Sequence, residues 1–421
     1  MNIHSNPQRT PAETALIEAF EERASDLPGN EAVIRQREDA IERLKAGLPT
    51  RRVEAWHYTD LRRLFTKVPA YDPSLLAKPL PALLESSTVL PVLNGVAAEA
   101  PKVAGVKVVR LEEKLVDGSF AQALTTGDPA DVIGPLNAAF VADGWHLDIA
   151  EGAEIAAPIE IQNVQAGGQA HVRLPVKVGA GARATIVERQ TGSGDALVSS
   201  VSHLVVGEGA EIVWIILQEQ PEGATHFGQF NAWIGKGAKL TLFVMNAGGK
   251  LVRQEIRVDA KGEDAEFRLR GVNLLSGDSH TDVTLVLDHS APCTTSTEVI
   301  RNVVTGRAHG VFQGQIRVDR QAQKTDAKMS CNTLLLSDDG EFSAKPELEI
   351  FADDVACGHG ATVTEIDRNH LFYLMARGVP EKEARGLLVK AFVAEIIEEL
   401  DDEAIVAALE ARLDGWFAAH G

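Results

Sequence analysis

The tetrapeptide Cys357-Gly358-His359-Gly360 has the residue types and spacing that best suit metal chemistry in this sequence. In an extended segment, residues two apart point to the same side of the chain, so the thiolate and the imidazole could contact one ion. These two ligands suit zinc, copper or iron–sulfur chemistry, and the glycines let a metal or a second chain approach the backbone closely. Because one chain supplies only two such groups here, a working site needs further ligands from a partner. The alternative is a packed thiol beside a surface histidine.

The other cysteines and the central histidines indicate structural roles. Cys331 precedes an apolar run and is expected to be a buried free thiol. Cys293 lies in a Thr/Ser-rich segment, where a structural or incidental position is expected. Three histidines lie at irregular spacing between expected strands, so we do not expect them to share a metal: His280, His289 and His309.

The sequence lacks the motifs of several common enzyme classes. It contains no Gly-x-x-x-x-Gly-Lys-Ser/Thr phosphate loop, no His-Glu-x-x-His, no Gly-x-Ser-x-Gly and no Cys-x-x-Cys. A dinucleotide-binding glycine motif that opens a helix is also missing. We therefore expect a protein that neither hydrolyses nucleotides nor carries out acyl transfer by itself.

Charge and hydropathy limit the partners and the location that we expect. The formal net charge is −19, whereas nucleic-acid binding needs clustered Lys and Arg, so nucleic acid is not an expected partner. No stretch approaches the roughly 18 uninterrupted apolar residues of a membrane span, and the first residues lack the apolar segment of a signal peptide. The expected location is therefore the cytoplasm, without membrane contact. Three cysteines are also too few for a disulfide scaffold.

A repeat with a fixed period of 28 residues predicts the central fold. Val178-Gly-Ala-Gly-Ala-Arg183 recurs as Val206-Gly-Glu-Gly-Ala-Glu211 and again as Ile234-Gly-Lys-Gly-Ala-Lys239. Each copy is a β-branched residue, a glycine turn and then an apolar run. A period of this length indicates one supersecondary unit stacked on its copies, and this unit contains no helical stretch. The sequence therefore predicts a parallel β-solenoid.

The chain divides into three expected regions. Residues 1–101 are interpreted as an N-terminal helical region and linker, in which the proline-rich segment 68–101 is a connector. Residues 102–355 form the expected β-helix core, and residues 356–421 form a C-terminal helical region. We expect the flanking helices to cover the unpaired strand edges at the two ends of the solenoid.

Helix signals are clear near the N-terminus. Thr10-Pro-Ala-Glu13 is a capping box with proline at the first helical position. A second helix is expected at about 30–46, with Ile34, Ile41 and Leu44 on its buried face and Gly47 as its stop.

The C-terminal region is expected to contain three helices, at Arg368–Ala376, Pro380–Leu400 and Glu403–Phe417. The apolar stripe of the second includes Leu387 and Leu388, and that of the third includes Leu409 and Trp416. Such helices could pack on the solenoid or present a docking surface to a partner.

Several segments together resemble the SufB/SufD family of the bacterial Suf iron–sulfur cluster assembly system. The matching segments are Glu54-Ala-Trp-His-Tyr-Thr-Asp-Leu61, Arg301-Asn-Val-Val-Thr-Gly-Arg-Ala-His-Gly310, Lys324-Thr-Asp-Ala327, Cys331-Asn-Thr-Leu-Leu-Leu-Ser337, Ala344-Lys-Pro-Glu-Leu348, Ala352-Asp-Asp-Val355, Cys357-Gly-His-Gly-Ala-Thr362, Leu371-Phe-Tyr-Leu374 and Arg377-Gly378. Two departures favour the SufD branch over the SufB branch. The chain lacks an N-terminal Cys-rich motif, and it has Cys-x-His-Gly-Ala-Thr where SufB typically has Gly-His-Glu-Ala-Thr.

The resemblance implies a right-handed parallel β-helix between helical terminal regions. It implies a non-catalytic scaffold that pairs with SufB through the solenoid and docks the SufC ATPase on its C-terminal helices. The family's cluster-building site lies at the SufB–SufD interface, where His359 is the matching ligand for iron or a nascent iron–sulfur cluster, with Cys357 beside it. The cluster is transient there, so no cofactor is expected in the isolated chain. The isolated chain could also form a homodimer through an open edge strand.

Two alternatives from other classes of protein are compatible with the sequence. One is a stand-alone β-helix enzyme, either an acyltransferase or a carbohydrate-active enzyme, although hexapeptide acyltransferases have coils of about 18 residues rather than the longer period seen in this chain. The other is a homo-oligomeric scaffold that needs neither SufB nor SufC. Purification of the chain with and without its partners separates these alternatives.

Overall fold

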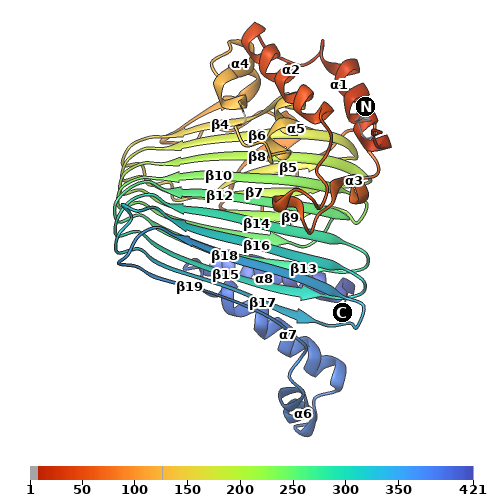
Figure 1. Cartoon of the computed structure of the whole chain (residues 1–421), viewed down its shortest axis with the longest axis vertical. Coiled ribbons are helices and arrows are strands. Elements are labelled where there is room, and N and C mark those ends of the chain that lie inside the picture. Colours follow the sequence, from red (N-terminus) through yellow and green to blue (C-terminus); the bar gives the residue numbers. More distant parts are fainter. Residues whose placement is uncertain (1–7, 126, 421) are drawn as a thin grey trace, which may run out of the picture.

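The computed structural model describes residues 8–125 and 127–420, and a parallel β-solenoid dominates it (Figure 1). Its strands form two sheets, and from β4 (Asp143–Ile149) onward successive strands alternate between them, so each turn of the chain adds one strand to each sheet. Helices lie before and after the solenoid in the chain. The mainly β fold with helical terminal regions is therefore confirmed.

The two sheets divide the strands almost equally. The ten-stranded sheet contains β1 (Thr88–Leu93), β2 (Val96–Ala97), β5 (Ile159–Gln165), β7 (Arg183–Gly192), β9 (Glu211–Glu219), β11 (Lys239–Asn246), β13 (Glu266–Leu275), β15 (Thr295–Val304), β17 (Asp326–Leu335) and β19 (Ala356–Thr364). The nine-stranded sheet contains β3 (Val106–Arg110), β4 (Asp143–Ile149), β6 (Gly168–Val178), β8 (Ala196–Val206), β10 (Thr225–Ile234), β12 (Leu251–Ala260), β14 (His280–His289), β16 (His309–Val318) and β18 (Glu341–Ile350).

The 28-residue repeat is the register of the solenoid. Val178 pairs in parallel with Val206, and Val206 pairs with Ile234, so equivalent residues of successive repeats stack directly on one another. Because the side chains of a strand alternate between its two faces, this register also stacks inward residues on inward residues.

The second glycine of each repeat forms one corner of the solenoid. Gly181, Gly209 and Gly237 have φ values of +66°, +65° and +60°, a left-handed conformation that costs glycine little. The N–H of Gly209 donates a hydrogen bond of 2.8 Å to the carbonyl of Lys236 in the next turn, and the other two glycines do likewise.

In later turns of the solenoid, residues other than glycine adopt the same left-handed conformation at this corner. Asp264, Cys293 and Lys324 adopt φ values of +59°, +59° and +68°. The N–H of Cys293 donates to the carbonyl of Gln323, 2.9 Å away, so the stacking is unchanged. The repeat therefore disappears from the sequence while the backbone continues to follow it.

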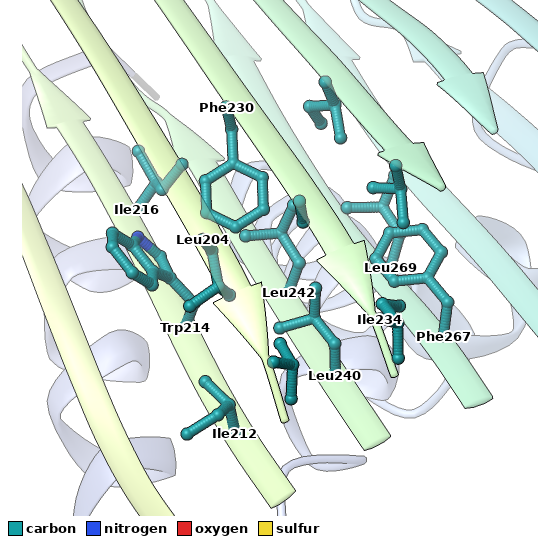
Figure 2. Packing of buried hydrophobic residues seen from close by; sticks show 14 of the residues in the cluster. Leu204, Ile212, Trp214, Ile216, Phe230, Ile234, Leu240, Leu242, Phe267 and Leu269 are labelled. Atoms are coloured by element: carbon teal, nitrogen blue, oxygen red, sulfur yellow. The ribbon is translucent and has the colours of Figure 1, made fainter. Parts of the chain in front are cut away.

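The core of the solenoid is a set of apolar columns between the two sheets. Figure 2 shows Trp214, Leu242 and Leu269 from successive strands of one sheet beside Phe230 and Ile234 from the other. All five are fully buried. Burial of each large apolar side chain contributes about 1.5–3 kcal/mol, and the stacked repeat makes this contribution continuous along the axis.

The N-terminal helices pack against the outer face of the nine-stranded sheet. They are α1 (Pro11–Arg23), α2 (Glu31–Lys45), the 3₁₀ helix η1 (Glu54–Trp56), α3 (Leu61–Leu64), α4 (Leu111–Val116), η2 (Ala121–Leu124) and α5 (Ile133–Phe140). The predicted capping box is present, since Thr10 and Glu13 each accept a backbone hydrogen bond from the other. Leu197 and Phe227 belong to the same buried cluster as these helices.

The buried face of α2 differs from the prediction. Ile34 is 44% exposed, whereas Val33 and Arg37 are buried together with Ile41 and Leu44. The Arg37 guanidinium donates to the carbonyl oxygens of Ala138, Ala139 and Val141 at the C-terminal end of α5. The inclusion of Ile34 was wrong because a buried arginine interrupts the apolar pattern of the true face.

The strands extend beyond both expected limits of the core. β1 lies inside the expected connector 68–101, yet it pairs in parallel with β5, so the solenoid begins at Thr88 rather than at 102. Pro91 makes this strand hard to recognise in the sequence, because proline has no backbone N–H to donate to a neighbouring strand. At the other end, β19 continues to Thr364, past the expected limit at 355.

The C-terminal region contains α6 (Arg368–Ala376), α7 (Glu381–Ile397) and α8 (Glu403–His420). α7 and α8 pack on the outer face of the ten-stranded sheet, with Leu409 and Trp416 buried as predicted. Leu387 is 47% exposed, so its assignment to the buried stripe was wrong; Val389 and Val393 are buried instead. No helix in the described part of the chain is long and apolar enough to cross a bilayer.

The C-terminal end of the solenoid is not covered by these helices. β18 and β19 are the terminal strands of their sheets, and each pairs on one side only. α6 lies beyond them, away from the rest of the molecule (Figure 1). The expectation that helices cover both ends is therefore wrong at this end, because α7 and α8 bury their apolar faces against a sheet face instead.

Candidate functional site

The terminal strand β19 carries both predicted ligands. It pairs in parallel with β17 along one edge, and its other edge has no strand beside it among the described residues. His359 is exposed and Cys357 is partly buried. An unpaired edge of this kind presents backbone N–H and C=O groups to another chain.

Register fixes the direction of the two side chains. Cys357 and His359 pair with Ala327 and Met329 of β17, which belong to the buried core between the sheets. Cys357 and His359 therefore continue an inward-facing column at its open end, and Cys357 packs against the core. The thiol and the imidazole lie on the same side of the strand.

The Cys357 thiol is held in its protonated form in the isolated chain. Partial burial raises its pKa, and the carboxylates of Asp326 and Glu298 raise it further. A metal or a sulfur species that binds this thiol must therefore displace a proton.

The ligand set on β19 is incomplete within this chain. Among residues 8–125 and 127–420, no group of three or more His, Cys, Asp or Glu side chains is placed to hold a metal ion. His280 and His309 lie 4.9 Å apart between ring centroids, but His280 bonds to Thr59 at 2.9 Å. His289 is buried inside the solenoid, where it contacts Thr294.

The two remaining cysteines do not belong to β19, although Cys331 lies on the neighbouring strand β17 and pairs with Ala361. Cys331 is buried, as predicted, and its pKa is raised to about 12, chiefly by burial. Asn302 donates a hydrogen bond to its sulfur at 3.3 Å. Cys293 is exposed at the solenoid corner described above.

A buried carboxyl below His359 was missed by the sequence reasoning. Glu298 of β15 pairs with Met329, and Met329 pairs with His359, so the three residues form one inward column. Glu298 is fully buried, neither of its oxygens has a hydrogen-bond partner within the described chain, and burial raises its pKa to about 8. The signal was available: Ser296, Glu298 and Ile300 alternate with outward residues along β15.

The aromatic N-terminal motif has a structural position. Trp56 is fully buried, and its indole N–H donates to the carbonyl of Ala130 at 2.9 Å. The Arg253 guanidinium lies 4.2 Å from the centre of its ring and forms a buried ion pair with Asp282. Thr59 also bonds to Asp282, so the motif fixes the N-terminal region to the solenoid.

A second exposed surface lies on the projecting C-terminal helices. Phe372 is 72% exposed and Tyr373 is 56% exposed on α6, and Met375 and Leu387 add to the apolar area. Soluble chains seldom expose several large apolar side chains together without a partner.

Comparisons with known proteins agree on one family. Residues 161–392 match the family model described as SUF system FeS cluster assembly, SufBD core domain. The chain is similar to the iron–sulfur cluster assembly protein SufD of Escherichia coli, with 28% identity over 386 residues, which covers 88% of this chain and 89% of that protein. It is 26% identical over 381 residues to the SufBD family protein Rv1462 of Mycobacterium tuberculosis, covering 87% and 90% of the two chains. It is 28% identical over 293 residues to the chloroplastic protein ABCI7 of Arabidopsis thaliana, which covers 66% of this chain and 61% of that protein.

Proposed function

Because this chain belongs to the SufBD core family of the SUF iron–sulfur cluster assembly system, we propose that it is a non-catalytic scaffold subunit for cluster assembly. The observation that carries this proposal is the open strand β19, which presents an inward thiol and imidazole without the further ligands that a metal needs. The cluster is cargo that forms on the complex. ATP hydrolysis belongs to a partner, SufC.

In this proposal, His359 binds iron or the nascent cluster together with groups from SufB. Its side chain is exposed at the open end of an inward column, so a facing subunit can bring ligands to it. Cys357 lies two residues away on the same side and supplies a second ligand once its proton is lost. Thiolate and imidazole are both established ligands for iron–sulfur centres.

SufB is the proposed partner of the open end. The free edges of β18 and β19 present backbone groups that a related solenoid can extend by strand addition. In the absence of SufB, we propose that a second copy of the same chain occupies these edges.

SufC is the proposed partner of the C-terminal helices. Phe372 and Tyr373 project from α6 and offer an apolar anchor of the kind that dominates many protein interfaces. ATP-driven movement of SufC would then be transmitted through α7, which packs on β13 and β15.

Co-expression of a His359→Ala chain with SufB and SufC tests the ligand role. We expect the complex to form in normal yield while its iron and sulfide content after assembly falls severalfold. Val363→Ala is the matched control, because Val363 is exposed on the same side of the same strand and has no ligating atom.

Two results would count against this role. Normal cluster content in the His359→Ala complex would show that the imidazole is not a ligand. Loss of the complex itself, with the Val363→Ala complex intact, would assign His359 to the interface rather than to the cluster.

A further inference from the structure

A chain of side-chain contacts links helix α7 to the terminal strand β19. The Arg301 guanidinium of β15 donates to the Glu395 carboxylate of α7 at 2.9 Å, and it also donates to the side-chain oxygen of Asn332 on β17. The Asn332 amide in turn donates to the hydroxyl of Thr362 on β19 at 2.7 Å. We call these four residues the α7–β19 network.

The register of the solenoid explains why three of these residues lie in one line. Arg301 pairs with Asn332, and Asn332 pairs with Thr362, so they occupy equivalent places on consecutive strands. On the two preceding strands the same column holds Met245 and Val272, which are fully buried in the cluster that contains the C-terminal helices. The outward column therefore changes from apolar to polar as it approaches the terminal strand.

Arg301 contacts α7 in two ways. Its guanidinium forms the ion pair with Glu395 and also lies 5.1 Å from the centre of the Phe392 ring, so only 14% of the side chain is exposed. A guanidinium presents five N–H donors in a planar fork, and it can therefore bond to a carboxylate and to an amide oxygen at the same time. Arg301 thus joins the helix to the next strand of the sheet.

The terminal strand depends on side-chain contacts more than an inner strand does, because β19 has a strand on one side only. On its outward side, Thr362 makes the bond described above, and the Thr364 hydroxyl donates to the carbonyl of Thr333 at 3.4 Å. Cys357 and His359 lie on the opposite, inward side of the strand. The network therefore acts on the position of β19 and does not contact the ligand atoms.

We propose that Arg301 is a positioning residue for β19, and that through Asn332 and Thr362 it couples the place of α7 to the strand that carries His359. When α7 holds Arg301, the strand is ordered and the imidazole keeps one direction. When α7 moves away, the strand loosens. The functional consequence rests on the proposed role of His359 in cluster assembly, whereas the coupling itself is a property of this chain.

Hydrogen exchange of the full-length chain without iron, followed by mass spectrometry, tests the coupling. Glu395→Ala removes the contact on α7 and keeps a strong helix-forming residue there. We expect the amides of β19 to exchange about three- to tenfold faster, as loss of one hydrogen bond implies, with no change in β10. Glu398→Ala is the control, because Glu398 is exposed at the end of the same helix and has no ion-pair partner within the described residues.

Substitutions of Thr362 separate the network from a general weakening of α7. Thr362→Val keeps the shape and strand preference of the side chain but removes the hydroxyl, so it should speed exchange in β19 by a similar factor. Thr362→Ser keeps the hydroxyl and should retain slow exchange. In the Glu395→Ala, Thr362→Val double variant the two effects should be less than additive, because both interrupt one path. Additive effects, or unchanged exchange of β19 in Glu395→Ala, would overturn the proposal.

A second measurement distinguishes this inference from the proposed function. In the complex with SufB and SufC, Thr362→Val should lower the iron and sulfide content after assembly severalfold, and Thr362→Ser should restore it. Normal content in the Thr362→Val complex, with low content in the His359→Ala complex, would refute the positioning role and leave the assembly role standing. The His359→Ala complex tests the assembly role independently of the network.

Discussion

Replacement of Glu298 by glutamine should remove much of the pH dependence of stability. The carboxyl lies in the apolar interior of β15, and neither oxygen has a hydrogen-bond partner within the described chain. Burial raises its pKa from 4.5 to about 8, and the charge of the Arg270 guanidinium lowers it only in part. The folded state therefore binds a proton that the unfolded state loses at lower pH.

The direction and the size of the pH effect on stability follow from the difference between the pKa values in the folded and unfolded states. A carboxyl with a raised pKa in the folded state imposes no penalty below about pH 4.5, and its penalty grows as the pH rises to about 8 and then levels off. Between about pH 5 and pH 8.5, the free energy of unfolding should fall by about 4 kcal/mol through this group alone. Glutamine has the same shape and does not titrate, so Glu298→Gln should lose this slope.

Equilibrium urea unfolding at a series of pH values measures the effect. We expect the stability difference between Glu298→Gln and the unmodified chain to grow with pH in favour of the variant. Glu266→Gln is the control, since Glu266 is partly exposed beside Arg268 and its loss should leave the slope unchanged. Parallel curves for Glu298→Gln and the unmodified chain would refute the buried neutral carboxyl.

Three further predictions concern the solenoid and its surfaces. Gly209→Ala should lower the free energy of unfolding by about 1–2 kcal/mol in urea titrations, because φ is +65° and nothing lies within 4 Å of the added Cβ atom; an unchanged midpoint would contradict the left-handed corner. Arg253→Met should lower the free energy of unfolding by about 3–5 kcal/mol, because it leaves the Asp282 carboxylate buried without its ion-pair partner. In thermal unfolding, the Asp282→Asn, Arg253→Met double variant should recover part of this lost stability. The Phe372→Ala, Tyr373→Ala double variant should bind SufC at least tenfold more weakly in pull-down titrations, while its own melting temperature stays unchanged. Undiminished binding would show that SufC docks at another surface.

The central fold was predictable because the corner glycines fix the register. Gly181, Gly209 and Gly237 recur at one spacing, and each takes the conformation that only glycine adopts cheaply. The later turns were harder to recognise, since Asp264 and Cys293 occupy the same backbone position without any compositional signal. Stacking from the adjacent turns holds these residues in a conformation that their own preference disfavours.

Errors in the helical regions share one physical cause. Ile34 was assigned to the buried face because apolar spacing suggested it, but the face is decided by Arg37, which satisfies three carbonyl oxygens at the end of α5. Tertiary hydrogen bonding of this kind cannot be read from the hydrophobic pattern of a single helix. Strand β1 was missed for another reason: Pro91 interrupts its strand pattern, and its partner β5 lies far along the chain.

The sequence predicted that Cys357 and His359 lie on one side of a strand, but it did not predict which residues surround them. Cys357 and His359 were identified by type and spacing, and strand geometry correctly placed them on one side of the chain. Glu298 was not identified, because its position below His359 depends on the register of β15, β17 and β19. The roles of Cys357 and His359 in binding iron remain predictions for the complex.

The uncovered strands at the C-terminal end make the two ends of the solenoid different. Helices α2 and α4 stand over the first turns of the solenoid, whereas β18 and β19 face outward at the opposite end (Figure 1). If a second copy pairs with β18 and β19, as proposed above for the chain without SufB, the two uncovered edges are joined to each other. Association through this end alone would give a closed pair of chains rather than a fibre.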